Sequence, residues 1–168
     1  MDALVFWRMT KTLLILPGTA LIYVPLVIHW LGDRWPFGPM DGTGIQWVLA
    51  VILAIPALVL AVRTMVLFTR EGQGTPAPWD PPRKFVVTGP YRYMRNPMLL
   101  SVILMILAEA LALGSLLLLG WAVAFFLLNT VYFAVKEEPD LERRFGEDYL
   151  RYKANVPRWV PLLQPYDS

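Results

Sequence analysis

Two clusters of reactive side chains stand at the ends of apolar segments. The first is the stretch GPYRYMRNP, residues 89–97, which holds two arginines, two tyrosines and an asparagine directly before an apolar run. The second is the pair Glu137 and Glu138, which closes the next apolar run. Ionisable groups at a membrane edge are costly unless they are partnered, so such a concentration indicates a functional site. Arginine donors, aromatic faces and carboxylates together suit a charged small molecule.

The composition is that of a membrane protein. Of 168 residues, 57% are apolar and 17% are charged, and the mean hydropathy is +0.50, well outside the balance of a soluble domain. There is no cysteine and a single histidine, which excludes disulfides, a thiolate nucleophile and the usual zinc ligand sets. We expect the bilayer as a partner, and neither a metal nor nucleic acid.

Four segments are long and apolar enough to cross a hydrocarbon core of roughly 30 Å as helices. They are residues 12–31, 45–69, 97–113 and 115–136. Gly114 and Ser115 separate the last two, which predicts a tight helical hairpin. The sequence therefore predicts one all-α integral membrane domain over residues 1–168, with about four transmembrane helices. Prolines should distort the first two spans locally, at Pro17, Pro25 and Pro56.

Basic residues predict the orientation. Most lysines and arginines precede the first span, lie between the second and third, or follow the fourth, whereas the other two connections hold only Arg34. Because cytoplasmic loops carry the excess of basic residues, both termini and the 70–96 loop should face the cytoplasm. Arg63 lies inside the second span near its cytoplasmic end, where it either snorkels to the headgroups or points into a cavity.

An amphipathic helix is predicted after the fourth span, over residues 139–154. Pro139 suits the first turn of a new helix and disfavours continuation of the old one. Four apolar or aromatic residues then recur at near-helical spacing, opposite a charged face: Leu141, Phe145, Tyr149 and Tyr152. This pattern is typical of an interfacial helix on the cytoplasmic side, with an interruption at Gly146.

If the last two spans form a hairpin, the two clusters of reactive side chains are neighbours at one membrane surface. Two interpretations are open for Arg95. It clamps a ligand carboxylate through paired N–H groups, or it pairs with Glu137 or Glu138 as a structural lock.

Several motifs occur in a familiar order. GPYRYMRNP, followed by a hairpin and then by EEPDL, FGEDYLRY and VPRWVP, resembles the isoprenylcysteine carboxyl methyltransferase family, within the wider group that includes phospholipid N-methyltransferases. The similarity covers residues 72–161. It implies that S-adenosylmethionine binds at the cytoplasmic face without a Rossmann domain.

Carried over position by position, the resemblance implies a set of cofactor-binding residues. Arg95 is added to this set because its guanidinium can bind a carboxylate. The set is Arg83, Lys84, Phe85, Val86, Tyr91, Arg95, Asn96, Pro97, Met98, Leu99 and Glu137. Two positions depart from the family, because Asn96 replaces a histidine and Leu99 a tyrosine. A carboxylate such as Glu137 accepts hydrogen bonds from both hydroxyls of a ribose, and an aromatic face attracts a sulfonium by about 0.5–2 kcal/mol.

Methyl transfer is an in-line displacement, so the protein mainly positions the nucleophile, an effect worth on the order of 7–11 kcal/mol. A carboxylate acceptor needs no base, whereas an amine must lose a proton, for which Glu138 is the candidate. Arg95 and Glu138 are thus the catalytic candidates. Members that methylate prenylcysteine carry an arginine where this chain has Phe133, and Lys136 or Arg158 could replace it toward a hydrophobic or lipidic substrate.

Two other functions fit the same residues. Some membrane sterol reductases share a related hairpin and bind a nicotinamide cofactor, and preference for NADPH would favour that class. A non-catalytic protein would use the basic loop and the amphipathic helix to hold anionic lipid or a partner. The methyl acceptor and the oligomeric state stay open.

Overall fold

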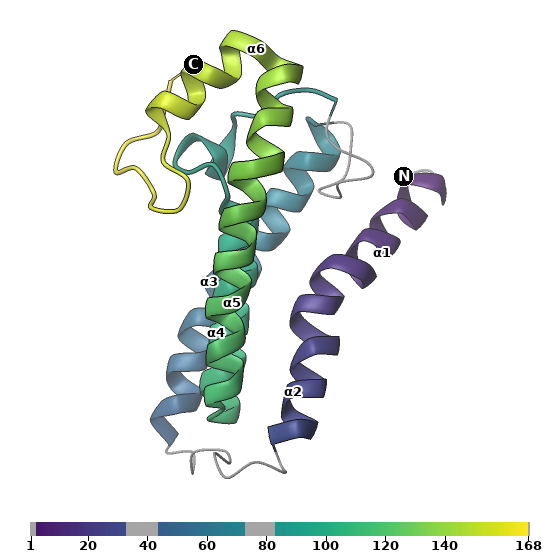
Figure 1. Ribbon diagram of the computed structural model, residues 1–168, viewed down its shortest axis with the longest axis vertical. Helices are drawn as coiled ribbons and strands as arrows, with labels where there is room; N and C mark the ends of the chain where they lie inside the picture. Colours follow the sequence, from purple (N-terminus) through teal and green to yellow (C-terminus); the bar gives the residue numbers. More distant parts are fainter. Residues whose placement is uncertain (1–2, 33–43, 73–82, 168) are drawn as a thin grey trace. The chain divides into compact units, whose positions relative to one another are not determined.

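The computed structural model describes residues 3–32, 44–72 and 83–167, and within these ranges it contains helices and no strand. Arg34 and much of the 70–96 loop, including Trp79, lie outside the described residues. The elements, in chain order, are α1 (Ala3–Gly18), the π-helix η1 (Thr19–Tyr23), α2 (Val24–Gly32), α3 (Gly44–Arg70), the 3-10 helix η2 (Gly89–Arg92), α4 (Pro97–Leu113), α5 (Leu116–Tyr132), the π-helix η3 (Phe133–Glu137) and α6 (Glu138–Asn155) (Figure 1).

Three helical stretches are long and apolar enough to cross a membrane, and they are Thr10–Leu31, Gly44–Arg70 and Leu116–Asn155. The fourth predicted span is α4, a shorter apolar helix of 17 residues. The predicted all-helical architecture is thus confirmed over the described residues, and three to four of the helices are compatible with membrane spans. The apolar part of the 40-residue stretch lies in α5, because charged residues begin at Lys136 and dominate α6.

Two π-helical turns mark places where the backbone accommodates proline. In η1, between Pro17 and Pro25, the Val24 N–H donates to Thr19 O, a bond from residue i to residue i−5. α3 continues through Pro56 without a break. The break expected before Pro139 does not occur. Instead η3 joins α5 directly to α6, and the Glu138 N–H donates to Phe133 O, which lets the helix absorb a proline in the first turn of α6.

The turn between α4 and α5 is fixed by local hydrogen bonds. Gly114 adopts a φ of 57°, its N–H donates to Leu111 O at 3.2 Å, and the Ser115 N–H donates to Ala110 O at 2.9 Å. This pair of bonds is a Schellman motif, which satisfies the last carbonyls of α4. The Ser115 hydroxyl then accepts from the Leu118 N–H at 3.3 Å and caps α5. The predicted tight turn is confirmed.

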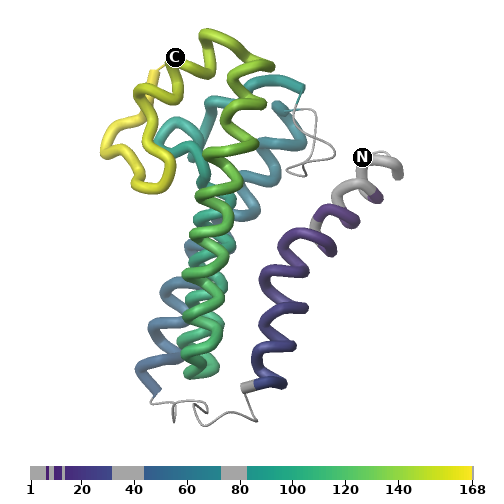
Figure 2. The backbone as a smooth tube through the Cα atoms, in the orientation of Figure 1, coloured from purple at the N-terminus to yellow at the C-terminus, as the bar shows by residue number. Residues whose placement is uncertain are grey.

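The contacts group the chain into two compact units. Unit 1 comprises Met1–Val59 and Ser101–Phe125, and unit 2 comprises Leu60–Leu100 and Phe126–Ser168. The core of unit 1 contains Ala20, Ile106 and Ala122, so small residues bring η1, α4 and α5 close together. The Trp121 indole N–H donates to Ala20 O at 3.0 Å. Figure 2 traces the backbone of these segments.

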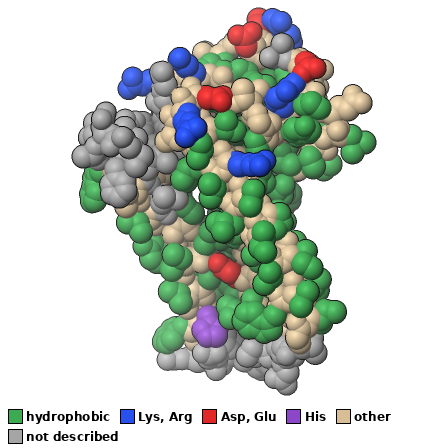
Figure 3. Space-filling view, turned by 180° about the vertical axis from the view of Figure 1, so that it is seen from behind, with side chains coloured by type: hydrophobic (Ala, Val, Ile, Leu, Met, Phe, Trp, Pro, Cys, Tyr) green, Lys and Arg blue, Asp and Glu red, His purple; other side chains and the backbone are tan. Residues whose placement is uncertain are grey.

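The core of unit 2 is aromatic. Tyr149, Tyr152 and Val156 are buried, and Phe85 and Phe145 are among the side chains that pack against them. The amphipathic pattern of the 139–154 region is confirmed, and its aromatic residues pack against the chain's own loop. The predicted interruption also occurs, because Gly146 has a φ of 55° inside α6. Charged side chains gather over this part of the molecule in Figure 3.

Candidate active site

The turn η2 is held against the end of α3. Gly89 has a φ of 55°, and a β-carbon added there would lie 2.8 Å from Leu67 Cδ1, so glycine permits both the left-handed backbone and the close approach. Tyr91, the central residue of the turn, is buried and meets the Phe68 ring edge-on at a centroid distance of 5.4 Å. Burial raises the pKa of the Tyr91 phenol well above its usual value, and Tyr152 adds to that rise.

Residues 156–167, which we call the C-terminal strap, run along the segment that leads into α4. Four backbone hydrogen bonds join them: Arg95 N–H to Pro157 O, 2.9 Å; Asn96 N–H to Arg158 O, 3.2 Å; Leu162 N–H to Tyr93 O, 2.9 Å; Tyr166 N–H to Arg92 O, 2.9 Å. The Arg92 side chain closes the strap, since its Nε donates to Tyr166 O at 2.8 Å and its guanidinium pairs with Asp167. The strap thus fixes the backbone on which Arg95 and Asn96 stand.

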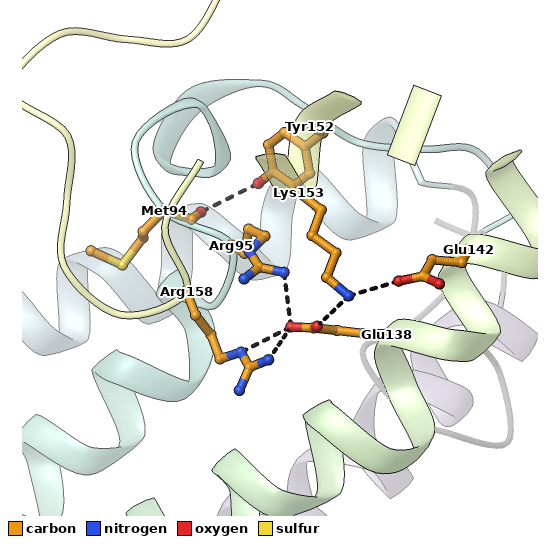
Figure 4. A network of polar contacts seen from close by, with 7 residues as sticks. All are labelled: Met94, Arg95, Glu138, Glu142, Tyr152, Lys153 and Arg158. Carbon is orange, nitrogen blue, oxygen red and sulfur yellow. Dashed lines mark hydrogen bonds and ion pairs between the residues drawn. The ribbon is translucent and has the colours of Figure 1, made fainter. Parts of the chain in front are cut away.

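Tyr152 connects α6 to the same segment. Its hydroxyl donates to Tyr91 O at 2.6 Å and lies 3.4 Å from Met94 O, and the second contact is drawn in Figure 4. A single buried phenol thus donates to a carbonyl inside η2 and lies within reach of one that follows it.

Glu138 is the centre of a buried ionic cluster (Figure 4). Its side chain is 4% exposed, and Oε1 accepts from Arg95 at 2.8 Å and from Arg158 Nε at 2.8 Å. Oε2 lies 3.1 Å from Lys153 Nζ, which also contacts Glu142 at 2.7 Å. Hydrogen bonds to Glu142 and Glu138 raise the pKa of Lys153. Three cations thus surround one carboxylate whose two oxygens are both engaged.

The bond between Arg95 and Glu138 confirms that the two predicted clusters are neighbours. It also favours the structural lock over the ligand clamp for the terminal nitrogen of Arg95. However, Arg95 Nε, Asn96 Nδ2 and Trp159 Nε1 are buried donors with no hydrogen-bond partner among the described residues. The two other unpartnered buried atoms in the described ranges are acceptors in unit 1, Gln46 Oε1 and Glu109 Oε2. Unit 2 therefore holds unsatisfied donors on Arg95 and Asn96, in the first cluster, and on Trp159, in the C-terminal strap.

The remaining residues of the predicted cofactor loop differ in burial. Arg83 and Lys84 are exposed, and their backbone N–H groups donate to Gly72 O at 2.8 and 3.3 Å. Phe85 stacks on Phe145 at 5.2 Å, and Val86 is buried. The loop is thus anchored to α6 by its aromatic side chain.

The other predicted site residues lie in the first turn of α4 and at the end of η3. Pro97 is fully buried, while Met98 and Leu99 are half-buried. Glu137 is half-buried next to the ionic cluster, and burial and Asp140 raise its pKa while Arg144 opposes that rise. Lys136 is exposed on η3. Of the two predicted substrate cations, only Arg158 joins the cluster.

Sequence reasoning placed Tyr152 on the amphipathic helix without giving it a role in the site, and it did not single out Lys153 or Trp159. The helical spacing of Tyr152 was its signal, but that spacing fits a lipid-facing and a protein-facing surface equally. Trp159 packs on Phe126 at a centroid distance of 5.0 Å. Lys153 gave no signal beyond its charge.

Comparison with known proteins then identifies the group to which the chain is related. Residues 45–148, more than half of the chain, match the family described as phospholipid methyltransferase. The chain belongs to the phospholipid methyltransferase family. The predicted resemblance is therefore confirmed at the level of the wider group, and membership indicates a membrane methyltransferase. The matched region contains both clusters and ends before Tyr149 and the C-terminal strap.

Over 63 residues the chain is 40% identical to an uncharacterized protein of Haemophilus influenzae, an alignment that covers 38% of this chain and 100% of that protein. No solved structure matches the chain.

Proposed function

We propose that this protein transfers a methyl group from S-adenosylmethionine to a lipidic or membrane-associated small acceptor at the cytoplasmic face. The active site would be formed by residues 83–99 and 136–152. Family membership supports the reaction class, and one observation supports the place: Arg95, which contacts Glu138 of the second segment, and its neighbour Asn96 each carry a buried donor without a partner among the described residues.

The donors fit the cofactor chemically. A buried N–H group without an acceptor costs about 1–3 kcal/mol, so a natural protein rarely keeps several together without a use for them. Asn96 is only 7% exposed, and its backbone is fixed by the strap residue that precedes Trp159. A ligand with carboxylate or hydroxyl oxygens satisfies such donors. We assign Asn96, Arg95 Nε and Trp159 to the carboxylate end of the cofactor.

Glu137 would accept from the ribose hydroxyls, because it is the carboxylate of the pair that Arg95, Lys153 and Arg158 leave unpaired. Tyr91 and Phe85 supply ring surface at the loop. When bound, the cofactor supplies a methyl group on a positively charged sulfur. The residues of the chain orient the reactants and exclude water, and the mechanism requires little acid–base chemistry.

The ionic cluster around Glu138 affects which chemical class of methyl acceptor is favoured. Both oxygens of Glu138 are engaged by cations, which favours an acceptor that is already deprotonated, such as a carboxylate. For an amine acceptor, Glu137 is the carboxylate that remains to accept the proton.

The test is incubation of the purified protein with methyl-labelled S-adenosylmethionine and a membrane lipid extract, followed by identification of the labelled product. Wild-type protein should label a lipid-soluble product, and Glu137→Gln should not. Glu147→Gln changes an exposed carboxylate of α6 that makes no contact with the ionic cluster among the described residues and should keep activity. Oxidation of NADPH without any methyl transfer would contradict the proposal.

A further inference from the structure

The C-terminal strap, the yellow segment that follows α6 in Figure 1, carries an exposed apolar edge. Two of its side chains face the protein, since Trp159 packs on Phe126 at a centroid distance of 5.0 Å and Leu162 packs against the aromatic core. Val160 and Leu163, which follow them in the sequence, are 71% and 100% exposed. The strap therefore presents one apolar edge to the protein and a second one to its surroundings.

The exposed edge is free of charge. Residues 159–165, WVPLLQP, include no acidic or basic side chain. The charges on either side of this segment are paired within the protein, Arg158 with Glu138 and Asp167 with Arg92. An exposed apolar surface bordered by polar groups indicates an interaction site. Its position on unit 2 indicates the partner.

The contact with α5 places the strap beside the apolar part of a long helix. Phe126, which Trp159 contacts, lies ten residues before Lys136, the first charged residue of the stretch Leu116–Asn155. Ten residues correspond to about 15 Å along a helix. The strap thus extends past the charged end of this stretch to a part that is apolar enough to lie in a membrane.

We infer that Val160 and Leu163 insert into the lipid bilayer, so that the strap anchors unit 2 to the leaflet at the α6 end of α5. Irregular backbone is tolerated at membrane depth only where the protein covers its polar groups. The strap meets this requirement on its inner edge, since Pro161 has no N–H group and the Leu162 N–H donates to Tyr93 O at 2.9 Å. The partner of the exposed edge is therefore a lipid surface.

This anchor is separate from the proposed active-site segments, residues 83–99 and 136–152, and from the region that matches the family. It is nevertheless connected to the site, because Arg158 O accepts from the Asn96 N–H at 3.2 Å. Insertion of Val160 into lipid thus holds the backbone that fixes Asn96. The inference requires neither cofactor nor methyl transfer, and it goes beyond the proposed function.

Fluorescence quenching of the full chain in phosphatidylcholine nanodiscs tests the inference. Because the chain has no cysteine, a nitrobenzoxadiazole dye can be attached at one position, in Leu163→Cys. Its emission should lie at shorter wavelength than that of the same dye in Asp148→Cys, and phospholipids that carry a nitroxide near the headgroup should quench it. Asp148→Cys is the control, because Asp148 is 79% exposed on the charged helix α6. Iodide in the water should quench the dye in this control instead.

Two results would overturn the inference. If iodide quenched the dye equally at positions 163 and 148, the strap edge would face water. If the dye at position 163 were shielded from both quenchers, a protein surface such as a second copy of the chain would cover the edge. Val160→Cys repeats the measurement at the second exposed position and should behave as Leu163→Cys does. Melting temperatures equal to that of the wild type verify that each labelled variant is folded.

Discussion

Each of the two units of this protein is stabilised internally by a different kind of contact. Unit 1 packs small and aliphatic side chains around Ala20, Ile106 and Ala122, and the Trp121 indole donates a hydrogen bond to a backbone carbonyl. Unit 2 combines an aromatic core with a buried ionic cluster.

This difference shows which unit has the more strictly determined arrangement of side chains. Lipid tails are as apolar as the side chains of unit 1, so its helices associate through close packing rather than through a hydrophobic driving force. In unit 2, buried charges and carbonyls permit few alternative arrangements, because each must find its own partner. The proposed site lies where that constraint is strongest.

The largest effect should come from Glu138→Ala. Removing the carboxylate leaves Arg95, Arg158 and Lys153 without their shared partner, and breaking a buried ion pair from one side costs about 3–5 kcal/mol. Thermal unfolding of the detergent-solubilised protein measures the loss. Asp148→Ala removes an exposed carboxylate, 79% accessible and 4.0 Å from Arg151, and should leave the melting temperature unchanged. Equal melting temperatures for both variants would mean that the cluster does not stabilise unit 2.

A smaller effect is expected for Tyr152→Phe. The variant keeps the ring but removes the hydroxyl that donates to Tyr91 O, which leaves a buried carbonyl unsatisfied at a cost of about 1–3 kcal/mol. Tyr166→Phe is the control, since the contacts of Tyr166 in this core are made by its ring and backbone. Hydrogen exchange of the residues around η2 should rise in Tyr152→Phe alone. Unchanged exchange there would show that the phenol does not hold the turn.

The smallest effect should be that of Trp121→Phe in unit 1. It removes the hydrogen bond to Ala20 O, and hydrogen bonds between membrane helices contribute about 0.6 kcal/mol on average. The melting temperature should fall less than in Tyr152→Phe. A larger fall in melting temperature than in Tyr152→Phe would mean that the side-chain hydrogen bond of unit 1 stabilises the protein more than that of unit 2.

The helices of both units were predictable from the sequence, because length and apolar composition determine spans and Gly114 marks the hairpin turn. The continuity of α5 and α6 was not predictable. A π-helix accommodates Pro139 by a change of hydrogen-bond register, and no residue type indicates such a change. The strap was missed for a related reason. Its bonds to Arg92, Tyr93, Arg95 and Asn96 are made by backbone groups, which every residue carries.

For the site, the sequence predicted that the two clusters meet, because a hairpin brings its ends together. It did not predict which carboxylate pairs with Arg95. Glu137 and Glu138 are adjacent, and the π-helical turn at η3 decides which of them faces the cations.

Calorimetric titration of the detergent-solubilised protein with S-adenosylmethionine tests the central claim most directly, with Asn96→Leu as the variant and Asn155→Leu as an exposed control. Asn96 Nδ2 has no partner among the described residues, so its removal should leave the melting temperature unchanged while the affinity falls about tenfold or more. Wild type and Asn155→Leu should bind alike. Absence of binding to wild type, or the same affinity in Asn96→Leu, would contradict the account.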